Sequence, residues 1–288
     1  METTDSQSLL VVKIGGGLGD IDAALTEIAA RTGPTVLVHG AHAALDDLSA
    51  RLGHPPRFVT STDGASSRYT DAVTMDHFLM AYCGVANKRI VERLQQMDCN
   101  AVGLSGIDGA IARGQRRATL RARDGDRVRA LRDDHTGRID TIDARLPRLL
   151  LDAGYVPVLT PPALSTEGVA INVDGDRFAA ELAVALGATQ LVILSDIPGV
   201  LGDPADPSTL IRDIWLDDTA AARTAATGRF RAKVEAVISA VTRGVEAAVI
   251  GDGRGPTPLA AALSGGGTWI RDRAVAHVAG PSAPQSAQ

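Results

Sequence analysis

The chain has 288 residues, of which 45% are hydrophobic and 22% charged, and its formal net charge is −5. This composition is typical of globular proteins and excludes disorder along most of the chain. No apolar run reaches the roughly 18 residues that a membrane-spanning helix needs, and the polar, acidic segment 1–8 does not resemble a secretory signal. We expect Cys83 and Cys99 to be reduced thiols, which are typical of cytoplasmic proteins. The sequence therefore predicts a cytoplasmic protein, and we expect it to have no membrane partner. Aromatic residues make up only 3%, which argues against nucleic-acid binding by base stacking.

Short apolar runs alternate with helical patterns along most of the chain. This alternation predicts an α/β fold with a mainly parallel sheet that helices cover on both faces. The expected strands are 9–14, 35–38, 101–104, 156–159, 190–194 and 247–250. The expected helices are 21–30, 43–52, 74–97, 141–153, 176–186 and 229–243. The segment 273–288 is rich in Ala, Pro, Ser and Gln, and we expect it to be disordered.

The basic segment 112–138 interrupts this alternation. It holds nine arginines and four aspartates, a local balance of +5, so the remainder of the chain carries −10. Its strand-like pieces flank Asp124-Gly125-Asp126, a sequence that favours a tight hairpin turn. A basic hairpin on an acidic protein indicates a docking face for an acidic partner. The alternative is a solvated hairpin whose charges pair with one another.

Lysine is rare in this chain, because only Lys13, Lys88 and Lys233 stand among 29 cationic residues. Lysine presents a compact point charge and arginine a wide planar fork, so these lysines are candidates for tasks that arginine cannot perform. Lys13 precedes the glycine turn 15–17 at the end of the first expected strand, and His39-Gly40 ends the second. Turns of this kind at the carboxyl ends of parallel strands expose N–H groups that suit anions. Neither a Walker motif nor a dinucleotide fingerprint is present.

Three later segments carry further polar residues at the ends of expected elements. Asp174 and Asp176 open the helix 176–186, the segment 194–200 follows a strand, and Lys233 lies near the start of the helix 229–243. A plain N-cap or first-turn acid explains one of the two aspartates but not the whole cluster.

Together these segments resemble the amino acid kinase family, and within it the N-acetylglutamate kinase-like branch that phosphorylates side-chain carboxylates. The landmarks are 12–16, 38–40, 67–71, 86–88, 170–176, 194–200, and Gly228 with Lys233, in family order over roughly residues 9–271. Within that branch the chain is most similar to kinases that act on an amino acid carried by LysW, a small acidic amino-group carrier protein. That similarity rests on 53–58, 67–71, 82–84, 103–106, 159–165 and 170–172.

The resemblance implies an αβα sandwich, the amino acid kinase fold, with a basic β-hairpin inserted. An N-terminal lobe, 1–165, would bind the acyl substrate and the carrier, and a C-terminal lobe, 166–272, would bind ATP. The reaction would be attack of a carboxylate on the γ-phosphorus of ATP, with Mg²⁺ as the second cofactor. The resemblance also implies a homodimer.

The site residues that the resemblance implies fall into four groups. The catalytic group is Lys13, Lys233 and Asp176, with the aspartate orienting both lysines. The substrate-binding group is Gly40, Ala41, His42, Arg68 and Asn172. The nucleotide-binding group is Gly15, Gly16, Ser195, Asp196, Leu201, Thr227 and Gly228. The carrier-docking group is Arg113, Arg116, Arg117, Arg121 and Arg123. We expect no metal site built from protein ligands alone and a structural role for Lys88.

The chain departs from the family pattern in three places. Ala41 and His42 follow Gly40 where further glycines are usual, Thr227-Gly228-Arg229-Phe230 replaces the usual Gly-Gly-Met, and Asp174 stands where some relatives have asparagine. Other interpretations are a kinase for free N-acetylglutamate, a kinase for another acceptor, and a non-catalytic regulatory relative. Glutamate and α-aminoadipate stay open as carried residues, since one methylene is worth only about 1–3 kcal/mol, as do lysine, arginine and specialised-metabolite pathways.

Overall fold

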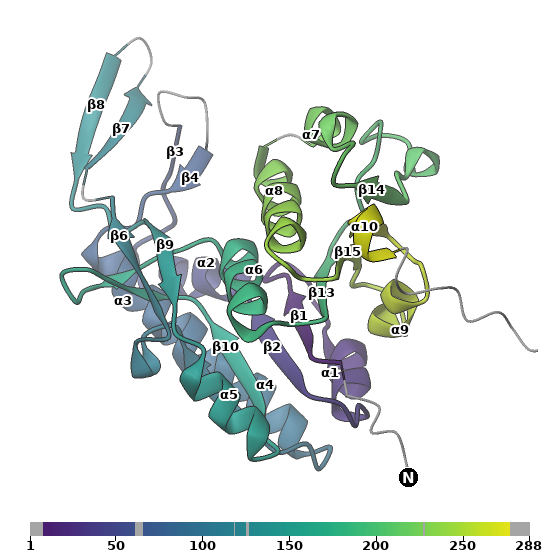
Figure 1. Cartoon of the computed structure of the whole chain (residues 1–288). Helices are drawn as coiled ribbons and strands as arrows, with labels where there is room; N and C mark the ends of the chain where they lie inside the picture. Colours follow the sequence, from purple (N-terminus) through teal and green to yellow (C-terminus); the bar gives the residue numbers. More distant parts are fainter. Residues whose placement is uncertain (1–7, 61–65, 118, 125–126, 227, 277–288) are drawn as a thin grey trace, which may run out of the picture.

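The computed structural model describes residues 8–276 except 61–65, 118, 125–126 and 227 (Figure 1). Its centre is one eight-stranded sheet, in which β15 and β16 are antiparallel and the other neighbours are parallel. In spatial order the strands are β14 (Asp213–Trp215), β16 (Thr268–Arg271), β15 (Ala247–Asp252), β13 (Gln190–Ser195), β1 (Leu10–Ile14), β2 (Thr35–His39), β10 (Val156–Thr160) and β5 (Ala101–Ser105). The mainly parallel sheet predicted from the sequence is confirmed.

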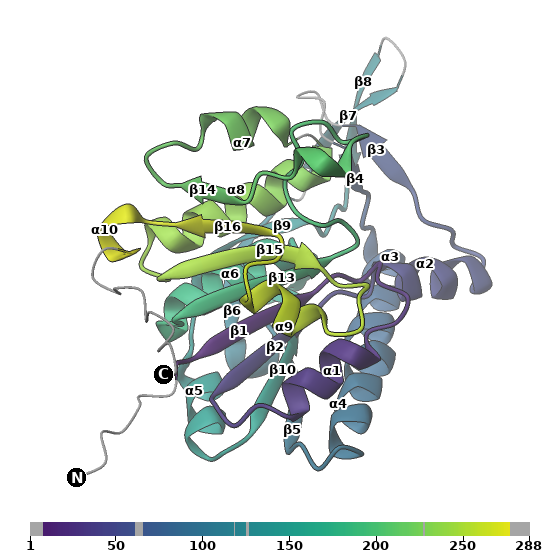
Figure 2. The same cartoon turned by 90° about the vertical axis from the view of Figure 1, so that its right-hand side faces the viewer.

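Helices cover both faces of this sheet, as the αβα prediction requires (Figures 1 and 2). The helices α5 (Arg145–Asp152), α6 (Gly175–Leu186) and α8 (Gly228–Thr242) pack on one face, and α1 (Asp22–Ala29), α4 (Asn87–Gln95) and α9 (Pro258–Leu263) on the other. Side chains alternate along β1, so Val11 joins the α6–α8 core whereas Leu10, Val12 and Ile14 join the α1–α4–α9 core. By the same alternation Lys13 points towards α6.

A third apolar cluster lies beside the sheet and supports the start of α2 (His42–Arg51). It contains Leu45 of α2, Met75 and Phe78 of α3 (Ala72–Phe78), and Tyr82 of the π-helical η1 (Leu79–Ala86). The rings of Phe78 and Tyr82 stack with centroids 3.8 Å apart. The helix predicted over 74–97 is therefore α3, η1 and α4 in succession, since apolar spacing alone cannot distinguish π from α turns.

The basic segment contains the strands of the predicted hairpin, which pair antiparallel, and two further strands. These are β6 (Ala112–Arg116), β7 (Thr119–Asp124), β8 (Arg127–Arg132) and β9 (Gly137–Ile142). β7 and β8 pair as an antiparallel ribbon that projects from the body (Figure 1); we call residues 119–132 the basic ribbon. β6 and β9 instead join β11 (Ala163–Ser165) and β12 (Ala170–Ile171) in a four-stranded sheet. Of the turn predicted at 124–126, Gly125 and Asp126 lie outside the described residues.

The helix predicted over 141–153 begins late, because β9 occupies residues up to Ile142. The Asp143 N–H bonds to the Ile111 carbonyl at 2.8 Å, and the Asp143 carboxylate accepts the Arg145 N–H at 3.0 Å. Asp143 therefore ends the strand and satisfies an N–H group at the start of α5.

Several short elements were not predicted. β3 (Phe58–Thr60) and β4 (Ser66–Arg68) form a second ribbon, and the strands β11, β12, β14 and β16 are also additional to the expected ones. The short helices that were not predicted are η2 (Asp108–Ala110), η3 (Pro207–Thr209), α7 (Ala220–Ala225) and α10 (Arg273–Ala276). α10 occupies the beginning of the segment expected to be disordered, and residues 277–288 lie outside the described residues. Within the described ranges, no helix is both long enough and apolar enough to cross a membrane.

Candidate active site

The carboxyl ends of β13, β1 and β2 lie side by side, because these strands are parallel neighbours. Ile14 pairs with Leu194 on one side and with His39 on the other. The N–H of Gly15 bonds to the Leu194 carbonyl at 2.9 Å, and the N–H of Gly40 bonds to the Ile14 carbonyl at 3.0 Å. The two predicted glycine turns and the start of the Ser195-Asp196 segment therefore share one edge of the sheet, where α/β folds bind ligands.

Close backbone contact explains the glycines of the two turns. A methyl group on Gly16 would lie 2.5 Å from the Ala41 nitrogen, and one on Gly40 would lie 2.9 Å from the Gly16 nitrogen. Ala41 has φ −153°, so the departure from glycine at this position requires no left-handed backbone. Ala41 precedes α2 without a side-chain cap. The Ala43 N–H bonds to the Gly16 carbonyl at 3.4 Å, so the first turn of α2 lies directly against the first glycine turn.

The three predicted catalytic residues form one buried cluster. Asp176 lies in the first turn of α6, where Lys13 approaches from β1 and Lys233 from α8. The Lys13 Nζ lies 2.5 Å from Asp176 Oδ1, and the Lys233 Nζ lies 2.8 Å from Asp176 Oδ2. Each of the three residues is less than 10% exposed. One carboxylate therefore holds two ammonium groups and leaves one excess positive charge beside the glycine turns.

Electrostatics keep this cluster ionised. Burial alone would raise the pKa of Asp176, but the charges and hydrogen bonds of Lys13 and Lys233 outweigh it and lower that pKa to about 2. Burial and the neighbouring charge of Lys13 lower the pKa of Lys233. Asp176 is therefore an orienting anion rather than a proton donor near neutral pH. Asp174 caps α6 by accepting the Arg177 N–H at 2.8 Å, a task that asparagine performs equally well.

The predicted acceptor-binding residues come from β4 and from the segment after β12. Arg68 contacts the carboxylate of Asp46 on α2, and its guanidinium lies 4.9 Å from the Phe58 ring centroid. The Arg68 side chain is 9% exposed, and its Nη1 has no hydrogen-bond partner among the described residues. Asn172 donates its amide N–H to the Thr70 hydroxyl at 3.1 Å. The structure therefore brings the segments 68–70 and 172 together, and Asp46 joins Arg68 to the helix that follows the second glycine turn.

His42 is the first residue of α2, and its side chain is exposed. A methyl group on Gly17 would lie 3.0 Å from the His42 ring. The imidazole therefore lies over the first glycine turn, at the edge of the site.

Lys88 has a structural position, as we expect from the sequence. Its Nζ donates to the Gly103 carbonyl at 3.0 Å and to Asn87 Oδ1 at 3.1 Å. The buried Asn87 was not predicted; its Nδ2 lies 3.1 Å from His39 Nε2 and 3.0 Å from the Val158 carbonyl. Asn87 thus ties the end of β2 to β10, and its place beside Lys88 in the segment 86–88 was the signal for it.

The predicted nucleotide-binding residues are only partly brought together. The Ser195 hydroxyl bonds to the Asp196 carboxylate at 3.1 Å, and a methyl group on Gly15 would lie 3.8 Å from the Ser195 Cα. Leu201 forms an isolated bridge with Leu210 in the loop after β13. Gly228 begins α8 with φ 54°, a left-handed conformation that favours glycine. Thr227 lies outside the described residues.

The arginines predicted to dock the carrier differ in their surroundings. Arg113 and Arg117 are exposed, whereas Arg116 donates to the Asp134 carbonyl at 2.9 Å and to the Asp133 carboxylate at 2.9 Å. Both acceptors belong to this chain, so the guanidinium of Arg116 is already paired within the protein. Arg121 and Arg123 belong to β7 of the basic ribbon, and their side chains lie outside what the structure describes.

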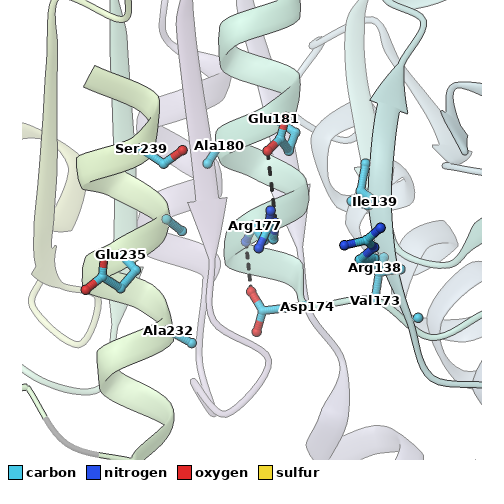
Figure 3. A pocket seen from close by; sticks show the side chains of 12 residues that line it. Arg138, Ile139, Val173, Asp174, Arg177, Ala180, Glu181, Ala232, Glu235 and Ser239 are labelled. Atoms are coloured by element: carbon cyan, nitrogen blue, oxygen red, sulfur yellow. Dashed lines mark hydrogen bonds and ion pairs between the residues drawn. The ribbon is translucent and has the colours of Figure 1, made fainter. Parts of the chain in front are cut away.

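A cavity of about 450 Å³ lies between β9, α6 and α8 (Figure 3). Its charged and polar lining residues are Arg138, Asp174, Arg177, Glu181, Glu235 and Ser239. The lining also includes Ala232, the neighbour of Lys233, but none of the residues predicted to bind acceptor or nucleotide. α6 and α8, which carry Asp176 and Lys233, form two of its walls.

Known proteins are similar in sequence to this chain over the residues that carry the site. The model of the amino acid kinase family matches residues 8–252. A "[LysW]-aminoadipate kinase" of Deinococcus radiodurans is 48% identical over 267 residues, covering 91% of each chain. Another of that name from Thermus thermophilus is 43% identical, covering 91% of this chain and 100% of its own. An "acetylglutamate kinase" of Methanopyrus kandleri is 36% identical, covering 91% and 99%.

Solved structures of similar shape show the same fold. An N-acetylglutamate synthase from Neisseria gonorrhoeae matches with a TM-score of 0.74 at 24% identity, covering 92% of this chain and 59% of its own. A carbamate kinase from Giardia lamblia matches with a TM-score of 0.65 at 16% identity, covering 93% and 99%. With the family model matching most of the chain, the protein belongs to the amino acid kinase family.

Proposed function

We propose that this protein is an ATP-dependent kinase that phosphorylates the side-chain carboxylate of an amino acid, α-aminoadipate or glutamate, carried by a small acidic LysW-type protein. The observation that carries the proposal is the buried Lys13–Asp176–Lys233 cluster beside the two glycine turns. The names of the relatives that are 48% and 43% identical support the carried substrate.

The proposed chemistry needs charge neutralisation more than acid–base help. A carboxylate is already ionised near neutral pH and attacks without a general base. Its oxygen forms a bond to the γ-phosphorus of ATP while the bond to the β,γ-bridging oxygen breaks, which yields an acyl phosphate and ADP. Both reactants are anions, so the enzyme must bring them into line and offset the charge on the moving phosphoryl group.

The residues of the cluster suit that task. Lys13 and Lys233 would contact the phosphoryl oxygens from two sides, held in place by Asp176. N–H groups of Gly16 and Ala41 would add hydrogen bonds that cost no reorganisation during the reaction, whereas the N–H of Gly40 already bonds to the Ile14 carbonyl.

The acceptor would lie against the segments 68–70 and 172. The Nη1 of Arg68, which has no hydrogen-bond partner in the described part of the chain, would bind the free α-carboxylate of the amino acid. The Asn172 amide nitrogen is occupied by Thr70, which leaves its carbonyl oxygen to accept the N–H of the bond to the carrier.

We propose Mg²⁺ as the ion that accompanies ATP. Among the residues described, no three His, Cys, Asp or Glu side chains gather into a metal site, and both lysines occupy Asp176. The residues therefore fit an ion held mainly by ATP phosphates, with the exposed Asp174 as a neighbouring carboxylate. When bound, the ion would neutralise charge on the β- and γ-phosphates.

We further propose that 1–165 forms the acceptor lobe, that 166–272 forms the nucleotide lobe, and that the protein is a homodimer. Val73, Met80 and Val85 on α3 and η1 are exposed large apolar side chains and would suit a subunit contact. Sedimentation of the wild type and of Met80→Glu tests the dimer, since a charge in that contact should yield monomer.

The decisive test compares acceptors and surface charges. ATP-dependent acyl phosphate, trapped as hydroxamate, should form faster with loaded carrier than with free N-acetylglutamate or N-acetyl-α-aminoadipate. Reversing Arg121 and Arg123 to glutamate should raise the KM for loaded carrier and flatten its dependence on salt, because charge steering is screened as ionic strength rises. The matched control reverses Arg89 and Arg145, two exposed arginines outside the basic segment. Equal KM values for the two reversed proteins at low salt would contradict carrier docking on the basic ribbon.

A further inference from the structure

The segment 133–137 joins the basic ribbon to the segments expected to bind the acceptor. β8 ends at Arg132, and Asp133 has φ 66°, so the chain turns sharply as it leaves the ribbon. The residues after Asp133 then pass between Thr70 and Asn172, and Thr136 forms a parallel bridge with Asn172.

Asp134 is the centre of this junction. Its side chain is fully buried. Oδ1 accepts the N–H of Thr70 at 3.2 Å and the N–H of Thr136 at 3.3 Å, and Oδ2 accepts the Thr136 hydroxyl. A buried carboxylate is tolerated only when donors surround it. Asp134 therefore cross-links the strand that carries Arg68 to the segment that follows the ribbon.

Backbone hydrogen bonds complete the connection. The His135 N–H bonds to the Thr70 carbonyl at 2.7 Å, and the Asn172 N–H bonds to the His135 carbonyl at 2.8 Å. The Tyr69 hydroxyl also donates to the Arg132 carbonyl, the last residue of the ribbon, at 2.6 Å. Thus hydrogen bonds join the end of the ribbon to the backbone that carries Arg68 and Asn172.

We propose that Asp134 is a positioning residue through which a carrier docked on the basic ribbon sets the geometry of Arg68 and Asn172 for the carried amino acid. The inference rests on the proposed function, which makes the ribbon the docking surface and those two residues the acceptor contacts. Asp134 acts through Thr70 and Thr136 and touches no reacting atom. The carrier then serves both as substrate and as the ligand that orders its own acceptor site.

The first experiment separates positioning from folding. Asp134→Ala leaves the N–H of Thr70 and the hydroxyl of Thr136 without their acceptor, and leaving such buried groups unpaired should raise the KM for the acceptor about 10–100-fold. The KM for ATP should stay within about twofold. Asp134→Asn should restore most of the loss, because its amide oxygen can accept both N–H groups while its amide nitrogen donates to Thr136.

The control is Asp143→Ala, which removes another carboxylate that accepts a backbone N–H, but at the start of α5. Should Asp134→Ala not fold, Thr136→Val removes only the hydroxyl donor and should raise the acceptor KM in the same direction. An acceptor KM unchanged in Asp134→Ala, or raised equally with the ATP KM, would overturn the proposal.

The second experiment tests the coupling itself. Arg121→Glu with Arg123→Glu is combined with Asp134→Ala, and kcat/KM for loaded carrier is measured for all four proteins. If Asp134 transmits docking, the ribbon change should cost several-fold less in the Asp134→Ala background; equal factors in both backgrounds would refute transmission.

If the proposed function is wrong, the acceptor preference of the wild type should reveal it, independently of the Asp134 variants. The wild type would then use free N-acetylglutamate in preference to loaded carrier, and the KM for that free acceptor in Asp134→Ala would still decide whether Asp134 positions Arg68 and Asn172.

Discussion

Asp176→Asn is the most direct perturbation of the buried Lys13–Asp176–Lys233 cluster. It keeps the shape of the side chain but removes the charge that holds Lys13 at 2.5 Å and Lys233 at 2.8 Å. The pKa of Asp176 lies near 2 rather than 3.8, which corresponds to about 2 kcal/mol of stabilisation by its neighbours. Removing one partner of a buried pair typically costs more, about 3–5 kcal/mol, because the remaining charges are left uncompensated.

Catalysis should suffer as well as stability. Without the carboxylate, Lys13 and Lys233 repel each other in a buried site, and Lys233 already has a lowered pKa. Removing the carboxylate should lower the pKa of Lys233 further, since the charge of Asp176 is among the groups that raise it. Losing one preorganised charge contact typically lowers the rate about 10²–10³-fold. Since a lysine with a lowered pKa is charged only below that pKa, the kcat of the variant should rise as the pH is lowered from 9 to 6.

Two measurements check this reasoning. Thermal unfolding should occur roughly 6–20 °C lower than in the wild type, from about 2–4 °C per kcal/mol for a chain of this size. Steady-state kinetics should show the fall in kcat and its pH dependence. The control is Asp143→Asn, which removes a carboxylate at the start of α5, away from the cluster. An Asp176→Asn protein with wild-type Tm and kcat would refute the role of the carboxylate.

Three further substitutions probe the same site. Lys13→Arg and Lys233→Arg should each lower kcat about 10²–10³-fold although the charge is kept, because a planar guanidinium cannot replace a buried ammonium held within 3 Å of Asp176; near-normal turnover of both would contradict the two-lysine mechanism. Arg68→Ala should raise the acceptor KM at least tenfold and leave nucleotide affinity unchanged, since Arg68 lies against Asp46 on the acceptor side. Titration calorimetry with an ATP analogue and steady-state kinetics check it, and lost ATP affinity with an unchanged acceptor KM would place Arg68 in the other site.

The sheet and the centre of the site follow from short-range patterns. β1, β2 and β13 are apolar runs ended by Gly15, Gly40 and Ser195, and parallel neighbours must bring such ends together. Side chains alternate along β1, and its apolar residues Val12 and Ile14 face α1, α4 and α9. Lys13 between them must therefore face α6. These features could be predicted because each depends on a few consecutive residues.

The acceptor side could not be predicted in this way. In the basic segment Asp134 is one of four aspartates among nine arginines, a pattern typical of a solvated surface. In the structure, however, Asp134 is fully buried. Its burial depends on Thr70, a residue 64 positions earlier. The contact of Arg68 with Asp46 likewise depends on how the β3–β4 ribbon lies against α2. Such long-range pairing has no local signature, so only the structure reveals it.

His39 supplies a prediction about pH that links stability to the glycine turn. Its ring is fully buried, with Nδ1 donating to the Gly40 carbonyl at 3.3 Å and Nε2 accepting from Asn87 at 3.1 Å, the pattern of a neutral imidazole. Burial, reinforced by the charges of Lys13 and Lys88, lowers its pKa from 6.5 to about 4. Between these values the unfolded chain binds a proton that the folded protein refuses, so the free energy of unfolding falls as the pH falls, by about 1.4 kcal/mol per unit and about 3 kcal/mol in all. Urea unfolding at pH 7.5, 6 and 5 should show this slope, and His39→Gln should reduce it by about 2 kcal/mol over that range. A slope identical in His39→Gln and in the wild type would mean that the ring is protonated in the folded protein, and that something other than a neutral His39 holds the Gly40 turn against Gly16.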